Sequence, residues 1–166
     1  MNDFSADAAL AAKGDTAAFA RLYSTVYKDM YRIALYSLRS PHDASDAVSE
    51  AVLDAFDSIK KLREPEHFRG WIMKILSAKI KRKQKEYFNV PSELDENLPE
   101  IDEFDYESAE LKEALGRLEP VSRLLLSLSV LGGYTSDEIA KICDLKASTV
   151  RSRISRIKEK LRLELT

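Results

Sequence analysis

Several residue types are scarce in this chain of 166 residues, and each scarcity excludes a class of protein. The single cysteine, Cys143, cannot close an intrachain disulfide, which is typical of a reducing compartment, and we expect it to be buried as a small hydrophobic residue. The two histidines, His42 and His67, are far apart with no cysteine nearby, so we expect no metal site. Five glycines and five prolines, together with 45% hydrophobic residues, predict a globular, all-α protein.

Long apolar runs are missing as well. The stretch Ile72–Ile80 is interrupted by lysines and is shorter than the roughly 20 residues that a membrane-spanning helix needs. Near the N-terminus, Asp3 and Asp7 replace the basic segment and apolar core of a secretory signal, so we expect no membrane insertion and a cytoplasmic location. The chain also has no glycine-rich phosphate loop, metal-ligand cluster or nucleophile-base pair, so we expect neither an enzyme nor a bound cofactor.

Charge is distributed unevenly along the chain. Residues 1–85 carry 15 basic and 11 acidic side chains, residues 86–110 carry 10 acidic and no basic ones, and residues 111–166 carry 11 basic and 7 acidic ones. This division predicts two small helical domains joined by an acidic linker, which also contains Pro91 and Pro99. We expect so acidic a linker to disfavour a core shared by the two domains. A solvating tether and a functional linker both fit this composition.

The first domain contains two clear helix patterns. Apolar residues at spacings of three and four predict a long amphipathic helix from Asp15 to about Arg39. Ser40 followed by Pro41, a cap residue and then a proline, signals the start of a second helix. The apolar residues of this second helix fall on one side: Val48, Ala51, Val52, Ala55, Phe56 and Ile59.

Two carboxylates share another face of the second helix. Asp46 and Glu50 are four residues apart, a spacing at which like charges destabilise a helix by roughly 0.2–0.5 kcal/mol. The pair is either a solvated face or a surface that meets a basic partner. In the second case we expect the repulsion to be offset in the complex and not in the free protein.

A third helix is predicted after Pro65, in the segment "WIMKILSAKIKRKQK". Its second half carries five cations within seven residues: Lys79, Lys81, Arg82, Lys83 and Lys85. Such a cluster favours binding to the phosphate backbone of a nucleic acid. Basic helix ends also occur because they complement the helix dipole, so this alternative stays open.

The C-terminal domain shows the pattern of a helix-turn-helix. Thr135 and Glu138 form a capping box that starts a short helix, and Asp144 and Leu145 follow it as a tight turn. The next helix places an apolar stripe toward the core: Val150, Ile154, Ile157 and Leu161.

The opposite face of this last helix is polar. Ser148, Ser152 and Ser155 lie opposite the apolar stripe, and Arg151 and Arg156 flank them. Small hydroxyl residues allow close approach, and the arginines can reach phosphates or guanine edges in a major groove. We therefore expect this helix to read DNA. The alternative is an ordinary helical hairpin with a basic face.

These motifs resemble those of the extracytoplasmic-function group of sigma-70-type sigma factors. From Gly14 to about Lys85 the resemblance is carried by "DTAAFARLYSTVY", "DASDAVSEAVLDAF" and "FRGWIMKI". From about Leu115 to Leu161 it is carried by a leucine-rich helix, by "YTSDEIA" and by "TVRSRISR". The resemblance implies domain 2 in residues 1–85, the linker in 86–110 and domain 4 in 111–166.

The resemblance also implies partners and contact residues. In the family, the helix matching residues 44–56 docks on core RNA polymerase, which makes Asp46, Ser49 and Glu50 candidate contacts. The segment matching residues 68–85 meets the −10 element, and its candidate contacts are Arg69, Lys74, Lys79, Lys81, Arg82 and Lys83. The helix matching residues 147–160 enters the −35 major groove, and its candidate contacts are Ser148, Thr149, Arg151, Ser152, Ser155 and Arg156. The implied partners are core RNA polymerase, promoter DNA and an anti-sigma factor, and the acidic linker would occupy the polymerase channel as a mimic of RNA.

Four positions depart from the family pattern. Ser49 replaces a glutamine, Ala78 an asparagine, Arg82 an aspartate, and Lys146 the serine that caps the reading helix. Loss of that cap weakens the start of the helix by about 1 kcal/mol, and Ala78 bears on promoter melting. Two other interpretations remain: a free-standing helix-turn-helix regulator that needs no polymerase, and an enzyme acting on nucleic acid, for which the residues offer little.

Overall fold

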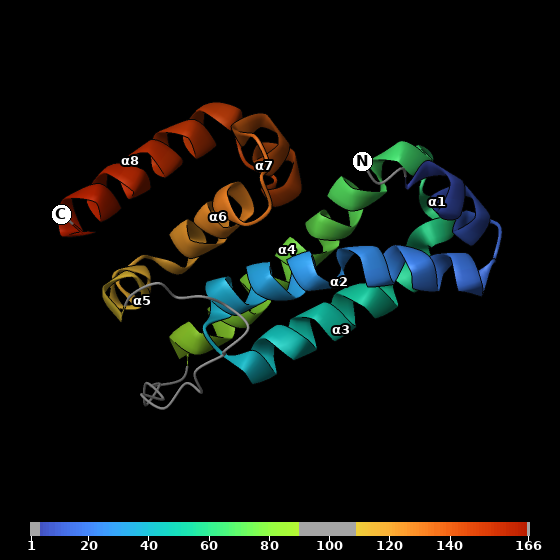
Figure 1. The fold of residues 1–166 in the computed structure, drawn as a ribbon, viewed down its shortest axis with the longest axis horizontal. Helices are drawn as coiled ribbons and strands as arrows, with labels where there is room; N and C mark the ends of the chain where they lie inside the picture. The colour runs from blue at the N-terminus through green and yellow to red at the C-terminus, as the bar shows by residue number, and fades with distance from the viewer. Residues whose placement is uncertain (1–3, 90–108, 166) are drawn as a thin grey trace.

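The computed structural model describes residues 4–89 and 109–165, and these residues fold into helices joined by short turns, as the all-α prediction requires (Figure 1). The α-helices are α1 (Ser5–Ala12), α2 (Thr16–Leu38), α3 (Pro41–Ser58), α4 (Phe68–Asn89), α5 (Ala109–Gly116), α6 (Pro120–Val130), α7 (Ser136–Cys143) and α8 (Ala147–Leu165). Two 3₁₀ turns, η1 (Ile59–Lys61) and η2 (Pro65–His67), connect α3 to α4.

The boundaries of α2 and α3 follow from local chemistry and confirm the predicted ones. The Asp15 carboxylate accepts a hydrogen bond of 3.1 Å from the Ala18 amide, which satisfies a donor in the first turn of α2. Arg39 ends α2 in the left-handed conformation, with φ 57°. The Ser40 hydroxyl then accepts a hydrogen bond of 3.2 Å from the Asp43 amide, and Pro41 is the first residue of α3.

The first module is a layer of α2, α3 and α4, with α1 packed across the end where α2 begins (Figure 1). The largest fully buried side chains of this layer are Leu22, Met30, Ile33, Leu35, Phe68, Ile72, Met73, Leu76 and Ile80. Burying one such side chain stabilises the fold by roughly 1.5–3 kcal/mol. Phe56 does not lie fully inside as predicted: it is 46% exposed, and its ring meets Phe19 edge-on at 5.2 Å between centroids.

The second module contains the predicted helix-turn-helix, α7 and α8. The Thr135 amide donates to the Glu138 carboxylate (2.9 Å), and the Glu138 amide donates to the Thr135 hydroxyl (3.2 Å), which confirms the capping box. Asp144 makes the turn with φ 56°. The predicted apolar stripe of α8 is buried at Val150, Ile154 and Ile157, and half-buried at Leu161.

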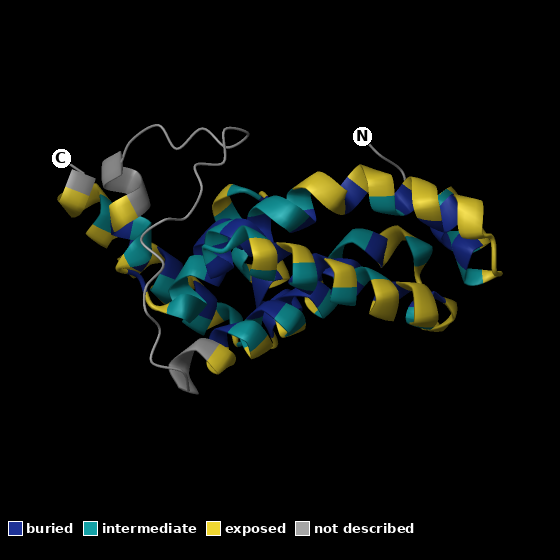
Figure 2. Ribbon diagram, turned by 90° about the horizontal axis from the view of Figure 1, so that it is seen from below, coloured by how far each residue is buried: buried dark blue, intermediate teal, exposed yellow. Residues whose placement is uncertain are grey.

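The two modules share one hydrophobic core, so the expectation that the linker disfavours a common core is wrong. α6 packs on α2 and α7 packs on α4, and the buried side chains form one continuous cluster across both modules. Figure 2 marks the buried residues along the ribbon of these helices. The physical reason is that α6 and α7 have apolar faces of their own, which bury Leu124, Leu125 and Ile139.

Two helices overlap the ends of the predicted linker. α4 continues through residues 86–89, and α5 already includes residues 109–110. Pro91 and Pro99 lie outside the described residues, and so do the other linker positions from 90 to 108. The domain boundaries therefore stay a prediction.

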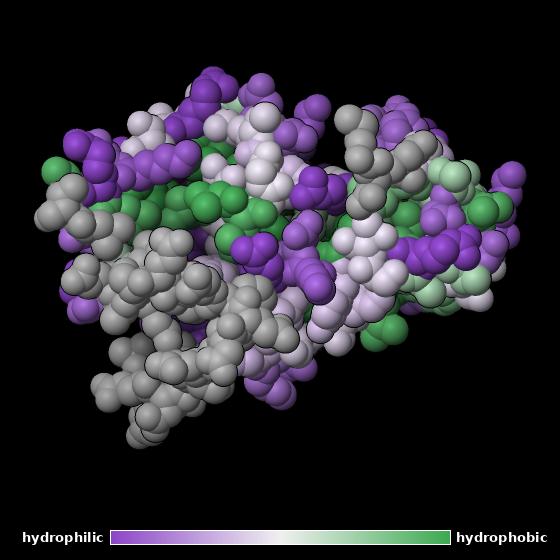
Figure 3. Space-filling view, viewed as in Figure 1, coloured by the Kyte–Doolittle hydropathy of each residue, from purple (hydrophilic) through white to green (hydrophobic). Residues whose placement is uncertain are grey.

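The surface of the described residues is mixed. Hydrophilic side chains surround an apolar strip that lies over α6 and α8 in the view of Figure 3. Within the described ranges, no helix combines the length and the apolar character needed to cross a membrane.

Candidate nucleic-acid and partner-binding surfaces

The polar face of α8 is open to solvent. Because Val150, Ile154 and Ile157 hold α8 against the rest of its module, the opposite face turns outward. The predicted reading residues on that face are exposed at Ser148, Arg151, Ser152, Ser155 and Arg156, and partly exposed at Thr149. α8 thus presents small hydroxyl groups flanked by guanidinium groups, an arrangement that fits a major groove.

Few contacts restrain the two arginines of this face. Arg151 pairs with Asp137 on α7 at 3.3 Å, and both side chains are exposed. Arg156 donates to the Ser152 carbonyl of its own helix at 3.4 Å. Exposed pairs of this kind contribute about 0–1 kcal/mol, so a phosphate or a base can displace them at small cost.

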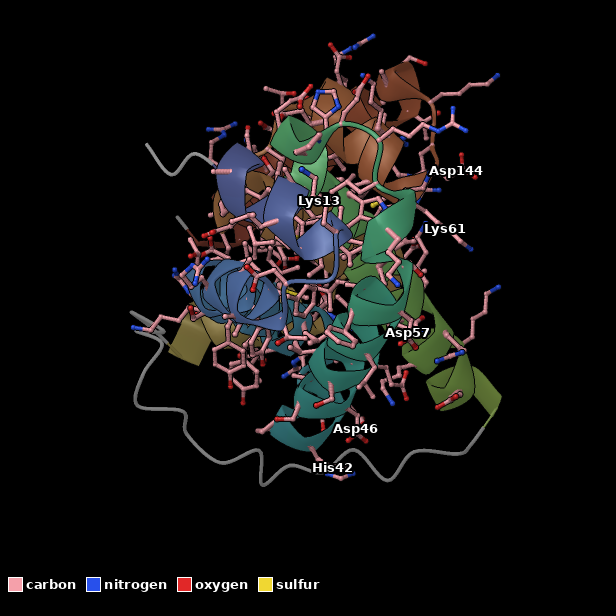
Figure 4. All side chains as sticks on the ribbon, turned by 90° about the vertical axis from the view of Figure 1, so that its right-hand side faces the viewer. Lys13, His42, Asp46, Asp57, Lys61 and Asp144 are labelled. Carbon is pink, nitrogen blue, oxygen red and sulfur yellow. The ribbon has the colours of Figure 1, made fainter. Side chains whose placement is uncertain are left out.

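The carboxylates Asp46 and Glu50 of α3 face cations of α4. Arg82 donates to Glu50 at 2.8 Å, and the Lys83 ammonium lies 3.9 Å from both Glu50 and Asp46. His42 also lies 3.4 Å from Asp46, at the end of α3 seen in Figure 4. The expectation that the repulsion between the two acids persists in the free protein is therefore wrong, because α4 supplies cations within 4 Å of both.

Lys79 completes this row of charges. Its ammonium lies 2.5 Å from Asp54 of α3. Lys79, Arg82 and Lys83, which we name the outer cations, therefore all pair with α3 carboxylates. Lys74 is exposed and makes no ion pair with another residue in the described part of the chain.

α4 also carries a second set of donors, which faces the second module. Arg69 donates to the Gly132 carbonyl at 3.1 Å, and its guanidinium lies 4.8 Å from the centroid of the Tyr134 ring. It also lies 3.5 Å from Asp29 of α2. Lys81 donates to the carbonyl of Cys143, the last residue of α7. Two of the residues predicted to contact the −10 element are thus engaged by the helix-turn-helix module.

A buried polar network extends this interface, and the sequence analysis missed it. Gln84 of α4 donates to the carbonyls of Pro120 (2.9 Å) and Ser37 (3.3 Å). Arg123 of α6 donates to the carbonyls of Ser37 (3.1 Å) and Leu118 (2.7 Å). The acceptors are main-chain atoms, which have no signature in the sequence. We name Arg69, Lys81 and Gln84 the inner donors.

Burial shifts the titration of several groups at this interface. Burial, with a smaller contribution from the charge of Arg39, lowers the pKa of Arg123 to about 10. Burial raises the pKa of Tyr134 to about 12. Burial also raises the pKa of the Cys143 thiol, whose Sγ lies 3.5 Å from the Ser77 hydroxyl of α4. The interface is therefore largely shielded from water.

The outer face of α3 adds apolar groups to its carboxylates. Leu53 is 65% exposed and Phe56 is 46% exposed, while Asp46 and Glu50 are partly exposed and Ser49 is exposed. An apolar centre with a charged rim is the usual anatomy of a protein-binding surface.

Both histidines lie near carboxylates, which the sequence analysis did not anticipate. The groups His42, Asp43, Asp46 and Glu64, Glu66, His67 each bring potential ligand atoms within 4.8 Å of one another. These groups lie at the surface, where carboxylates are commonly solvated. Nothing in either group assigns a metal.

Comparison with known proteins identifies both modules. Residues 22–86 match the family model of sigma-70 region 2, and residues 108–161 match that of sigma-70 region 4. The RNA polymerase sigma factor SigV of Bacillus subtilis is 31% identical over 142 residues, which cover 84% of this chain and 86% of SigV. The ECF RNA polymerase sigma factor SigW of the same species is 27% identical over 172 residues, covering 92% of this chain and 91% of SigW.

Two solved structures have a similar fold. CnrH, in complex with the cytosolic domain of CnrY, superimposes with a TM-score of 0.76 at 22% identity, over 99% of this chain and 97% of CnrH. The sigma factor RpoE of Bartonella quintana, in complex with the anti-sigma factor NepR, superimposes with a TM-score of 0.68 at 19% identity, over 89% of this chain and 96% of RpoE.

Proposed function

This chain belongs to the extracytoplasmic-function sigma factors of the sigma-70 family, which direct promoter-specific transcription initiation, and we propose that it reads a promoter with α8 and α4. α8 reads the −35 element, and α4 meets the −10 element. A sigma factor is not an enzyme, and RNA synthesis belongs to the polymerase. The observation that carries the proposal is the two-sided α8, with buried Val150 and Ile154 opposite exposed Arg151 and Arg156.

Core RNA polymerase docks on the outer face of α3 in this proposal. Asp46, Ser49 and Glu50 offer polar contacts to a basic partner, and the neighbouring Leu53 and Phe56 offer apolar ones. Carboxylates in a partly desolvated interface can contribute several times more than exposed pairs, which contribute about 0–1 kcal/mol. The outer cations hold these carboxylates in place in the free chain.

The −10 surface consists of the cations of α4. Lys74 is exposed, and the outer cations Lys79, Arg82 and Lys83 lie on one edge of the helix. Arg69 and Lys81 join this surface only when they leave the helix-turn-helix module. Because Ala78 replaces the usual asparagine, the cations carry more of the binding here than base-specific contacts do.

The chain works in the cytoplasm under the control of an anti-sigma factor. Two observations support this: two sigma factors of similar fold were solved with such partners, the CnrY cytosolic domain and NepR, and the single cysteine is buried as a free thiol. Core RNA polymerase and promoter DNA are the other partners.

The test is transcription from fragmented genomic DNA by core RNA polymerase with and without this chain. We expect new start sites that share two motifs at a fixed spacing. Tight binding to an isolated duplex without any association with core polymerase would instead indicate a free-standing regulator.

A further inference from the structure

We infer that the guanidinium groups of Arg39 and Arg123 form a binding site for a phosphate group, supplied by a free phosphate ion or by a phosphomonoester such as a nucleotide. The site lies where the end of α2 meets the turn between α5 and α6 (Figure 1). It goes beyond the proposed function, because neither arginine belongs to the surfaces proposed for the promoter and the polymerase.

Both guanidinium groups lie at the same junction. Arg123 of α6 donates from Nε to the Ser37 carbonyl (3.1 Å) and from Nη1 to the Leu118 carbonyl (2.7 Å). Arg39 follows Ser37 by two residues. Its guanidinium lies over Gly116, two residues before Leu118, with Cζ and Nη2 at 2.9 and 3.1 Å from the position that a Cβ of this glycine would occupy. The two positive charges are therefore neighbours, and after burial the charge of Arg39 is the second cause that lowers the pKa of Arg123.

No carboxylate balances this pair of cations within the described ranges. Neither Arg39 nor Arg123 forms an ion pair there, and the acids closest to them in the sequence, Asp43 and Glu119, are not paired with them either. Both arginines are half-buried, so water screens their mutual repulsion less than it would at a fully exposed site. An anion that reached both guanidinium groups would remove this repulsion.

The backbone at Arg39 gives a second, independent indication. Arg39 ends α2 in the left-handed conformation, with φ 57°, where glycine is favoured and other residues are uncommon. A glycine would end the helix at this position without strain. Strained residues are often found where the side chain has a function. Here an arginine occupies a strained position and also stands beside a like charge, which is expected if its guanidinium binds a ligand.

The number of available donors selects phosphate as the ligand. A guanidinium group has five N–H donors. Arg123 uses two of them on carbonyls, and the Arg39 guanidinium donates to no acceptor in the described part of the chain. A carboxylate offers one charge and two oxygens, which a single arginine already satisfies. A phosphomonoester offers about 1.5 to 2 negative charges and three terminal oxygens, which suit two adjacent guanidinium groups.

The test measures the binding of inorganic phosphate to the full chain by isothermal titration calorimetry and thermal unfolding. At about ten times the Kd, phosphate should raise the Tm of the wild-type chain by about 3–6 °C. Arg39→Gly should weaken phosphate binding at least about ten-fold, because one of the two guanidinium groups is lost. Since glycine adopts the left-handed conformation without strain, the Tm of Arg39→Gly without phosphate should equal or exceed that of wild type.

A second variant tests the site without changing any charge. Gly116→Ala adds a methyl group at the position over which the Arg39 guanidinium lies, so the guanidinium must move away. Phosphate binding should then fall at least about five-fold, because the two guanidinium groups no longer meet one phosphate. Arg162→Ala is the matched control: it removes an exposed arginine that is paired with Glu159 and should leave phosphate binding within about two-fold of wild type.

Further probes distinguish the ligands. Acetate, with one charge, should bind at least about ten-fold more weakly than phosphate, and equal affinity would overturn the assignment to phosphate. A nucleoside monophosphate that binds more tightly than inorganic phosphate identifies a nucleotide as the source of the phosphate group, whereas equal affinity identifies the free ion. The inference is wrong if the wild-type chain binds no phosphate or if Arg39→Gly binds it as wild type does. Should Arg39→Gly fail to fold, unchanged phosphate binding by Gly116→Ala would overturn the inference instead.

Discussion

Along α4, the cations that face α3 and the donors that face the helix-turn-helix module bind different acceptors. The outer cations Arg82 and Lys83 pair with carboxylates at the surface, while Arg69 and Lys81 donate to main-chain carbonyls of the other module. Exposed charge pairs are weak and are screened by salt, whereas a buried carbonyl left without its donor is costly. The basic helix α4 thus contacts two neighbours through different interactions: α3 through ion pairs with carboxylates, and the helix-turn-helix module through hydrogen bonds to main-chain carbonyls.

The largest expected effect comes from reversing the charge of the two α3 carboxylates that pair with the outer cations. Asp46→Lys with Glu50→Lys should weaken binding to core RNA polymerase at least about 100-fold, because both charges then repel a basic partner. Since Arg82 and Lys83 also lose their partners, the free energy of unfolding should fall by roughly 1 kcal/mol. Pull-down with core polymerase and urea denaturation measure the two effects.

A matched control changes the same number of charges elsewhere. Glu64 and Glu66 are exposed near η2, so Glu64→Lys with Glu66→Lys should leave polymerase binding unchanged. If the α3 variant binds polymerase with wild-type affinity, its carboxylates are only a solvated face and docking lies elsewhere.

The cations of α8 extend the comparison to a third set, which is exposed and weakly restrained. Arg151→Ala and Arg156→Ala should each weaken binding to a −35 duplex about ten-fold, within the 1–3 kcal/mol typical of a base contact. A phosphate contact should lower the salt slope by about one unit, and a base contact should relax specificity at one position. Titration at several salt concentrations distinguishes the two, with Arg162→Ala as the control, and unchanged binding in both variants would contradict the groove assignment.

The hydrogen bonds of the inner donors can be weakened without changing any charge. Gln84→Ala leaves the Pro120 carbonyl without the Gln84 donor and removes one of the two donors to Ser37, so it should lower the free energy of unfolding by about 1–3 kcal/mol. Urea denaturation measures this loss. A change below about 0.5 kcal/mol would mean that water replaces the amide and that the interface is wetter than the burial of Gln84 indicates.

The smallest expected effect belongs to a single outer cation. Arg82→Ala removes one exposed ion pair with Glu50 and should change the free energy of unfolding by about 0–1 kcal/mol. The comparison between the two sets predicts that Arg82→Ala costs less than Gln84→Ala under the same conditions. The reverse order would show that the ion pairs of the outer cations, and not the hydrogen bonds of the inner donors, stabilise the arrangement of α4.

The helices and their caps could be predicted from the sequence because their causes are local. Asp15, Ser40 and Thr135 cap the helices that follow them, and the apolar spacing along α8 set which face is buried. Side-chain identity carries this information directly.

Contacts between the modules could not be predicted in the same way. The sequence predicts Lys81 as a contact for DNA, but its acceptor in the structure is a main-chain carbonyl, and every residue has one. The pairing of Glu50 with Arg82 joins residues 32 positions apart, so no local spacing indicates it. The net charge of the linker also did not predict whether the two modules share a core, because burial at α6 and α7 depends on their own apolar faces.

The place of Cys143 makes the chain its own conformational reporter. It is a free thiol, buried at the end of α7 against α4, so an alkylating reagent reaches it only when the thiol becomes accessible. Opening of the contact between α7 and α4 would also remove the burial that raises the pKa of this thiol, so more of it would be the reactive thiolate. Both changes speed alkylation. The rate of labelling of the unmodified protein, followed by mass spectrometry as core polymerase is added, therefore reports how accessible the contact between α7 and α4 becomes.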